Sequence, residues 1–202
     1  MHSDFAPGRT FPDFVLPDGT NTEHQLSTLQ GGDPMLVVLI RSLLCPKDRE
    51  QLASLARVHA LLGTACCKLV AITTDAPPAE TEEAAALNAL LHDQAQHVRD
   101  TLDIAVLTDD GDEPPLIPHT FLLAPGLGIR KVWNGRHPWG WPSSCELHDA
   151  LCELTREMRR ESAGPRAGAG GERSGTALDQ TLNDMVAACR DGRRFVAPRS
   201  TP

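Results

Sequence analysis

An unbroken apolar run from Leu36 to Ile40 is followed, after four intervening residues, by Cys45-Pro46 and then by apolar residues at helical spacing. A run of this kind is typical of a strand that is buried on both faces of a parallel sheet. Proline suits the first position of a helix, because the N–H that it lacks has no intrahelical partner there. The sequence therefore predicts a buried strand followed by a helix, with Cys45 as the N-cap residue.

The predicted position of Cys45 has a chemical consequence. At a helix start, free backbone N–H groups and the positive end of the helix dipole favour a thiolate over a thiol, which makes the sulfur nucleophilic near neutral pH. The cationic residues Arg41, Lys47 and Arg49 lie close in sequence and act in the same direction. The alternative is that Cys45 is a small buried hydrophobe, as cysteines often are. We favour the reactive thiol.

The remaining apolar segments predict an open α/β sheet. Helices are expected over residues 46–62, 82–102 and 146–160, and further strands over 68–74, 103–108, 117–123 and 128–133, after a short β-rich entrance at 9–29. Strands and helices that alternate in this way favour a layered sheet over a helix bundle or a sandwich.

The C-terminal part has a different composition. Residues 162–175 are mainly Gly, Ala, Pro and Arg, which predicts a flexible linker. Beyond it, apolar residues recur at helical intervals between 178 and 189. This pattern is compatible with a short amphipathic helix and equally with a mostly disordered tail. We predict one domain over residues 5–160 and a tail over 161–202.

Charge and cysteine content narrow the function classes. A formal charge of −8 argues against unspecific nucleic-acid binding, which needs a basic face. No apolar run is long enough to cross a bilayer, and the N-terminus lacks the apolar core of a signal peptide, so the cytoplasm is the expected location. There the six cysteines are better interpreted as redox-active or incidental thiols than as a disulfide framework. Without a CxxC pair or an HxxxH motif, neither a metal nor a cofactor is expected.

Four stretches together carry a family resemblance: Ala6-Pro7-Gly8 with Pro12-Asp13-Phe14, Arg41 to Pro46 continued by Arg49 to Leu52, Pro118 to Leu122, and Trp133-Asn134-Gly135 with Trp139 to Ser143. In this order and spacing they resemble the AhpC/TSA and redoxin family, the peroxiredoxin-like proteins of the thioredoxin fold. The resemblance covers residues 6–160. It implies a thioredoxin-like α/β fold in which helices flank a central mixed sheet.

The resemblance also implies a site and an activity. Cys45 would reduce a hydroperoxide, Ser42 would hold the peroxide oxygen, Arg41 would help to ionise the thiol, and Pro118, usually a cis proline in the family, would form the opposite wall. The sequence departs from the family in the strand before the cysteine, where Val38 replaces a proline and Ser42 a threonine, and at Asp48, where redox-active CxxC members have a second cysteine. The arginine usual in the strand of Pro118 is also missing, so Arg41 or Arg130 would have to supply the charge.

The expected partners follow from this chemistry. They are a hydroperoxide or a protein disulfide as substrate and a thiol reductant such as a thioredoxin-like protein, and the chain could form a homodimer. Cys189 on the tail is the first candidate for a resolving thiol, although a cysteine without a role is the more common case at such a place. The other cysteines are expected to be packing residues. Two alternatives stay open, a thiol–disulfide oxidoreductase and a catalytically degenerate redoxin that acts as a binding or scaffold protein.

Overall fold

A computed structural model describes residues 5–40, 42–62, 67–75, 87–104, 119–134 and 142–163. The chain divides into two compact units, Met1–Pro142 and Ser143–Pro202.

The first unit is built on a five-stranded mixed sheet with the strand order β5-β4-β3-β6-β7. Its strands are β3 (Met35–Leu39), β4 (Lys68–Thr73), β5 (Ala89–His92), β6 (His119–Ala124) and β7 (Gly128–Asn134). β3 pairs in parallel with β4, and β4 with β5, whereas β6 is antiparallel to both β3 and β7. All five residues of β3 are buried, as expected for a central strand covered on both faces.

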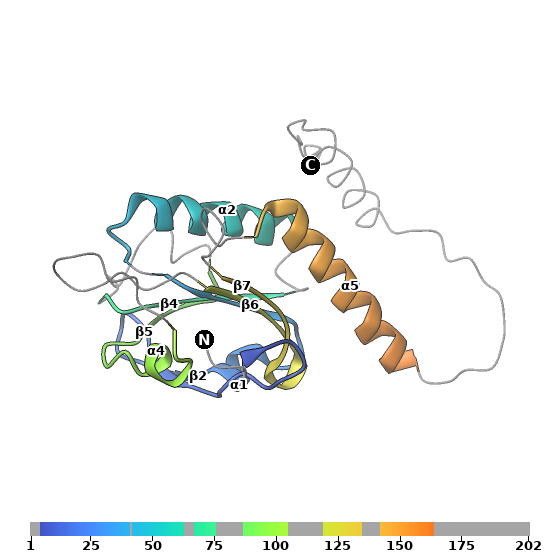
Figure 1. The fold of residues 1–202 in the computed structure, drawn as a ribbon, viewed down its shortest axis with the longest axis horizontal. Coiled ribbons are helices and arrows are strands. Elements are labelled where there is room, and N and C mark those ends of the chain that lie inside the picture. Colours follow the sequence, from blue (N-terminus) through green and yellow to red (C-terminus); the bar gives the residue numbers. More distant parts are fainter. Residues whose placement is uncertain are drawn as a thin grey trace, which may run out of the picture. The chain divides into compact units, whose positions relative to one another are not determined.

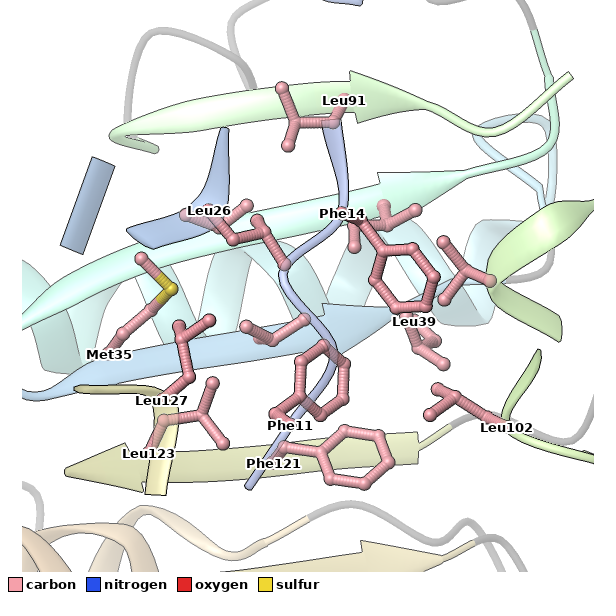
Figure 2. Packing of buried hydrophobic residues seen from close by; sticks show 14 of the residues in the cluster. Phe11, Phe14, Leu26, Met35, Leu39, Leu91, Leu102, Phe121, Leu123 and Leu127 are labelled. Atoms are coloured by element: carbon pink, nitrogen blue, oxygen red, sulfur yellow. The ribbon is translucent and has the colours of Figure 1, made fainter. Parts of the chain in front are cut away.

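Helices and a small hairpin cover the two faces of this sheet. The long helix α2 (Pro46–Leu62) lies on one face, and the short elements β1 (Val15–Pro17), β2 (Glu23–Gln25), α1 (Leu26–Gln30) and α4 (His97–Thr101) lie on the other (Figure 1). The main apolar core fills the space between the sheet and these short elements (Figure 2). Phe11, Phe14 and Phe121 lie at its centre, with the rings of Phe11 and Phe121 4.9 Å apart.

A buried amide holds the connection between β6 and β7. The side chain of Gln30 is 1% exposed. Its Nε2 donates to the carbonyl of Ala124 at 2.8 Å, and its Oε1 accepts the N–H of Leu127 at 2.9 Å. Leu127 has a φ of 59°, a left-handed conformation that is uncommon for residues other than glycine. Gln30 lies in α1, far from this turn in the sequence. Its side chain provides the hydrogen-bond partners of two backbone groups in the turn, the Ala124 carbonyl and the Leu127 N–H.

Most of the predicted elements are present, but the helix expected over 82–102 is wrong in its described part. Residues 89–92 form strand β5, whose central residues Leu90 and Leu91 are buried beside β4, and only residues 97–101 are helical. The alanine- and leucine-rich composition suggested a helix, yet pairing along the edge of β4 overrides that propensity. Asp103, the predicted start of the next strand, has a φ of 47° and follows α4 in a turn.

The second unit contains the helix α5 (Ser144–Ala163), which includes the predicted span 146–160. A capping box fixes its start. The Oγ of Ser143 accepts the N–H of Glu146 at 3.2 Å, and the Glu146 carboxylate accepts the Ser143 N–H at 2.9 Å. Residues 164–202, where the linker and the tail helix were predicted, lie outside the described residues. In the part of the chain that is described, no helix is both long and apolar enough to span a membrane.

Candidate active site

Cys45 lies immediately before α2. It follows the carboxyl end of β3 and is therefore at that end of the sheet. Its carbonyl oxygen accepts the N–H of Arg49 at 3.1 Å, the first bond of the helix, while Pro46 occupies the first helical position. The cysteine is partly exposed. The structure therefore places it where the sequence predicted, at the start of a helix and not in the apolar interior.

A tight turn joins β3 to this helix. The N–H of Cys45 donates to the carbonyl of Ser42 at 3.2 Å, and the N–H of Leu44 donates to the Ser42 Oγ at 3.0 Å. Leu44 at the tip of the turn is 88% exposed. These bonds fix the backbone on the N-terminal side of Cys45 before any substrate arrives.

Asp75, just beyond the end of β4, anchors the turn from the neighbouring strand. One carboxylate oxygen, Oδ2, accepts the hydroxyl proton of Ser42 at 2.6 Å and the N–H of Leu43 at 2.9 Å. Because the Ser42 hydroxyl donates to Asp75, its oxygen faces other groups as an acceptor. The sequence analysis did not identify Asp75. The signal was available, since the carboxyl ends of adjacent parallel strands meet at the same edge of a sheet.

Asp48 supports the same turn from within α2. Its Oδ2 accepts the N–H of Ser42 at 3.2 Å, and its side chain is fully buried. In sequence it stands three residues after Cys45, where CxxC proteins carry their second cysteine. A carboxylate in the first turn of a helix is also favoured by the helix dipole. Asp48 thus has a defined structural role at a position that the sequence identified only as a missing cysteine.

The strand register separates Arg130 from Cys45. Arg130 is the extra residue of a bulge in β7, where the pairing with β6 shifts between Leu122 and Leu123. Leu122 pairs with Leu36, near the start of β3, whereas Cys45 follows the other end of that strand. Arg130 therefore lies at the opposite end of the sheet from the Cys45 turn and is poorly placed to stabilise its thiolate.

His119 and Thr120 begin β6 at the same end of the sheet as the turn, opposite Leu39 and Val38 of β3. His119 is buried and stacks on Phe121 in the main core, with ring centroids 6.0 Å apart. The ring of His119 therefore belongs to the apolar core and is not solvated. Thr120 is fully buried, and its Oγ1 has no hydrogen-bond partner in the described structure.

Three of the predicted site residues, Arg41, Pro118 and Cys189, lie outside the described residues. Their assigned roles stay predictions. Cys67 is 1% exposed, as a packing residue should be, whereas Cys152 is only partly buried and does not fit the core position expected for it. Within the described ranges, no three His, Cys, Asp or Glu side chains are grouped so that they could hold a metal ion.

A five-stranded mixed sheet flanked by helices, in which the strand before the helix that follows Cys45 is central, defines a thioredoxin-like fold. The comparison of sequences specifies the family. A model of the AhpC/TSA family matches residues 7–132, well over half of the chain, and the protein belongs to this family.

Solved structures support the fold. The peroxidoxin BcpB from Mycobacterium tuberculosis is similar with a TM-score of 0.57 at 20% identity, covering 74% of this chain and 96% of that one. A thiol peroxidase from Chromobacterium violaceum gives 0.57 at 19% identity, covering 76% and 88%. A putative thiol:disulfide interchange protein DsbE from Chlorobium tepidum gives 0.53 at 17%, covering 73% and 99%. A search of curated proteins found no match.

Proposed function

We propose that this protein reduces hydroperoxides through Cys45, using a thiol as the final electron donor. The observation that carries the proposal is the partly exposed sulfur at the start of α2, in a turn that Asp75 and Asp48 hold from two sides. Membership of the AhpC/TSA family supports it. The helix start favours the thiolate, which is the nucleophilic form.

The reaction divides into an oxidation and a reduction. The Cys45 thiolate attacks one oxygen of the hydroperoxide, the O–O bond breaks, and the other oxygen leaves and takes up a proton as an alcohol or water. Cys45 then carries a sulfenic acid, which condenses with a thiol to a disulfide and releases water. A second thiol, supplied by a reductant such as a thioredoxin-like protein, regenerates Cys45 by exchange.

Ser42 is the residue that we propose orients the peroxide. Its hydroxyl proton is directed to Asp75, so its oxygen can accept the O–H of a hydroperoxide. This assignment keeps the contact predicted from the sequence but makes the serine the acceptor. Arg41 remains the candidate to stabilise the negative charge that develops on the leaving oxygen, and Pro118 the candidate for the opposite wall.

A sulfenate trap tests the proposal. The full-length reduced protein is treated with one equivalent of hydrogen peroxide or of an organic hydroperoxide in the presence of dimedone, and the labelled peptides are mapped by mass spectrometry. We expect the label on Cys45, its loss in Cys45→Ser, and its retention in Cys145→Ser, which changes another partly exposed cysteine.

Consumption of peroxide in the presence of a dithiol reductant should follow the same pattern. An unlabelled Cys45 and unconsumed peroxide would contradict the proposal and favour the scaffold alternative. If the protein instead reduced a protein disulfide and left peroxide untouched, it would be an oxidoreductase of the exchange type.

A further inference from the structure

The tip of the turn before Cys45 carries an exposed apolar side chain. Leu44 is 88% exposed, and among the residues that the structure describes the other exposed large apolar side chain is Val15, at 53%. Pro46, on the other side of the cysteine, is also exposed, and Leu43 is half-buried. Because burial of a large apolar side chain is favourable, Leu44 has more to gain from a partner surface than any other large apolar side chain in the described ranges.

Two hydrogen bonds hold the backbone of this tip. The N–H of Leu44 donates to the Ser42 Oγ at 3.0 Å. The N–H of Leu43 donates to the Asp75 carboxylate at 2.9 Å. A surface that is already ordered loses less conformational entropy when a partner binds. The free protein therefore presents Leu44 on a backbone that need not be ordered by the partner.

The geometry of a disulfide brings any protein thiol that reacts with Cys45 close to Leu44. The two Cα atoms of a disulfide are about 4.4–6.8 Å apart, and the Cα atoms of Leu44 and Cys45, as chain neighbours, are about 3.8 Å apart. A protein whose cysteine is bonded to the Cys45 sulfur therefore has its surface at the exposed tip.

The shape of the tip favours a protein over a small molecule. Sites for small ligands are concave and enclose most of the ligand's surface, whereas a side chain that is 88% exposed encloses nothing. The apolar part of an organic hydroperoxide would stay largely in water there. A partner protein can supply the depression that receives the side chain, since the centres of protein interfaces pack as densely as protein interiors.

We propose that Leu44 is the apolar anchor through which a protein reductant recognises Cys45, and that this reductant carries its reactive thiol beside a shallow apolar depression. The inference rests on the proposed function in one respect, that a thiol regenerates Cys45.

The step at this contact is an exchange. The thiolate of the partner attacks the Cys45 sulfur of a disulfide Cys45–S–S–R, and the new Cys45–S–S–partner bond forms as the old S–S bond breaks. The departing RS⁻ takes up the proton that the partner thiol lost. A second thiol of the partner then attacks the partner's own sulfur and releases the Cys45 thiolate. The partner is oxidised to a disulfide, while Cys45 and R–S are reduced, so atoms and electrons balance.

The test starts from Cys45 that is already in a disulfide. The full-length protein is converted to its mixed disulfide with thionitrobenzoate, a leaving group of low pKa, so that an incoming thiol attacks the protein sulfur. One probe is a thioredoxin whose second active-site cysteine is replaced by serine, which leaves the two proteins linked. The other probe is glutathione, a thiol too small to contact the tip as a protein would. After an acid quench, mass spectrometry follows the product on the Cys45 peptide in time.

Leu44→Ser removes the apolar side chain, and Leu44→Met keeps an apolar one at the same place. Val15→Ser is the matched control, because it changes the other exposed large apolar side chain. We expect Leu44→Ser to react about tenfold more slowly with the thioredoxin, as for one large apolar side chain that is no longer buried. Its rate with glutathione should not change, and Leu44→Met and Val15→Ser should keep the wild-type rates with both probes.

The ratio of the thioredoxin rate to the glutathione rate decides the outcome. An equal ratio in Leu44→Ser and the wild type would overturn the proposal, including the case in which both rates fall because the turn has moved. Sedimentation velocity examines a different occupant, since a wild-type dimer that Leu44→Ser dissociates would assign the tip to a second copy of the chain and overturn the proposal as well. No peroxide is used, so the result is independent of the dimedone test of the proposed function.

Discussion

The hydroxyl of Ser42 donates to the carboxylate of Asp75 across 2.6 Å, joining residues that are 33 positions apart in the sequence. The same carboxylate oxygen accepts the N–H of Leu43, so one side chain just beyond the end of β4 fixes the turn that precedes Cys45. Hydrogen bonds to an ionised group are shorter and stronger than neutral ones. The position of the sulfur thus depends on a residue that follows a different strand, β4.

Two substitutions of Asp75 should distinguish the effect of its negative charge from the effect of the two hydrogen bonds that it accepts. Asp75→Asn keeps an oxygen that can accept from Ser42 and Leu43, whereas Asp75→Ala removes both bonds. We expect the rate of peroxide reduction to fall about 10-fold to 100-fold in Asp75→Ala, as for a displaced reacting group, and clearly less in Asp75→Asn. Stopped-flow measurement of the rate constant checks this.

Asp93→Asn is the matched control for Asp75. Asp93 stands just beyond the end of β5, and its carboxylate accepts the N–H groups of His97 and Val98 at the start of α4. Its replacement should lower stability without changing the rate constant. Equal rate constants for Asp75→Ala and the wild type would show that the anchor is not needed for the reaction.

Asp48→Cys should give the protein a local disulfide partner for Cys45. Side chains three residues apart at a helix start have Cβ atoms about 5–6 Å apart, close enough for a disulfide after a small adjustment. We expect peroxide treatment to yield this disulfide in place of a persistent sulfenic acid, as peptide mapping without reduction would show. Lys47→Cys, with the new thiol only two residues away, is the control and should form none. A sulfenic acid that persists in Asp48→Cys would contradict the expectation.

Gln30 should make a large contribution to stability for a polar residue. Gln30→Ala leaves the Ala124 carbonyl and the Leu127 N–H without their partner in a buried place. At about 1–3 kcal/mol for each of the two unsatisfied groups, we expect a loss of about 2–6 kcal/mol in the free energy of unfolding. Urea denaturation measures it. The control is Gln25→Ala, which removes an exposed bond to Asp13 and should cost much less.

The stability that Asp18 contributes through the β1–β2 hairpin should decrease as the pH falls. Hydrogen bonds from the Thr20 hydroxyl, the His24 ring and the Thr22 N–H hold the pKa of this carboxyl well below its ordinary value of 3.8. A lowered folded-state pKa gives stability that is present above the unfolded value and is lost as the pH falls through the folded one.

The difference in urea midpoint between wild type and Asp18→Asn should therefore be largest near neutral pH and shrink below the ordinary aspartate pKa of about 4. Asp100→Asn, at another exposed aspartate, controls for the loss of one negative charge. A difference that stays constant with pH would show that the hydrogen bonds around Asp18 do not distinguish its charged form.

The parts of the fold that could be predicted are those in which one local signal dominates. The run ending at Ile40 and the Cys45-Pro46 pair identify β3 and the start of α2, because burial on both faces and the geometry of proline leave few alternatives. The segment at residues 89–92 could not be predicted in the same way. Its composition favours a helix, and it becomes a strand because the edge of β4 is available for pairing.

The candidate site shows the same division. Cys45 and Ser42 lie next to the strand and helix signals in the sequence and were identified from them. Asp75 contacts Ser42 only because β3 and β4 pair in parallel, and it was not identified. Arg130 was considered because of its charge, and the bulge and the strand register place it elsewhere. A contact that depends on how two strands pair is therefore not predicted by the local pattern of residues in either strand.

The buried aspartate in the first turn of α2 has a consequence for how long oxidised Cys45 would persist. In CxxC proteins the second cysteine of the same helix reacts with the oxidised cysteine and forms a disulfide, so no thiol from another molecule is needed for that step. Here that place holds a carboxylate, so recovery would wait for a thiol brought from elsewhere. The oxidised fraction of the protein would then report the supply of reductant as much as the level of peroxide.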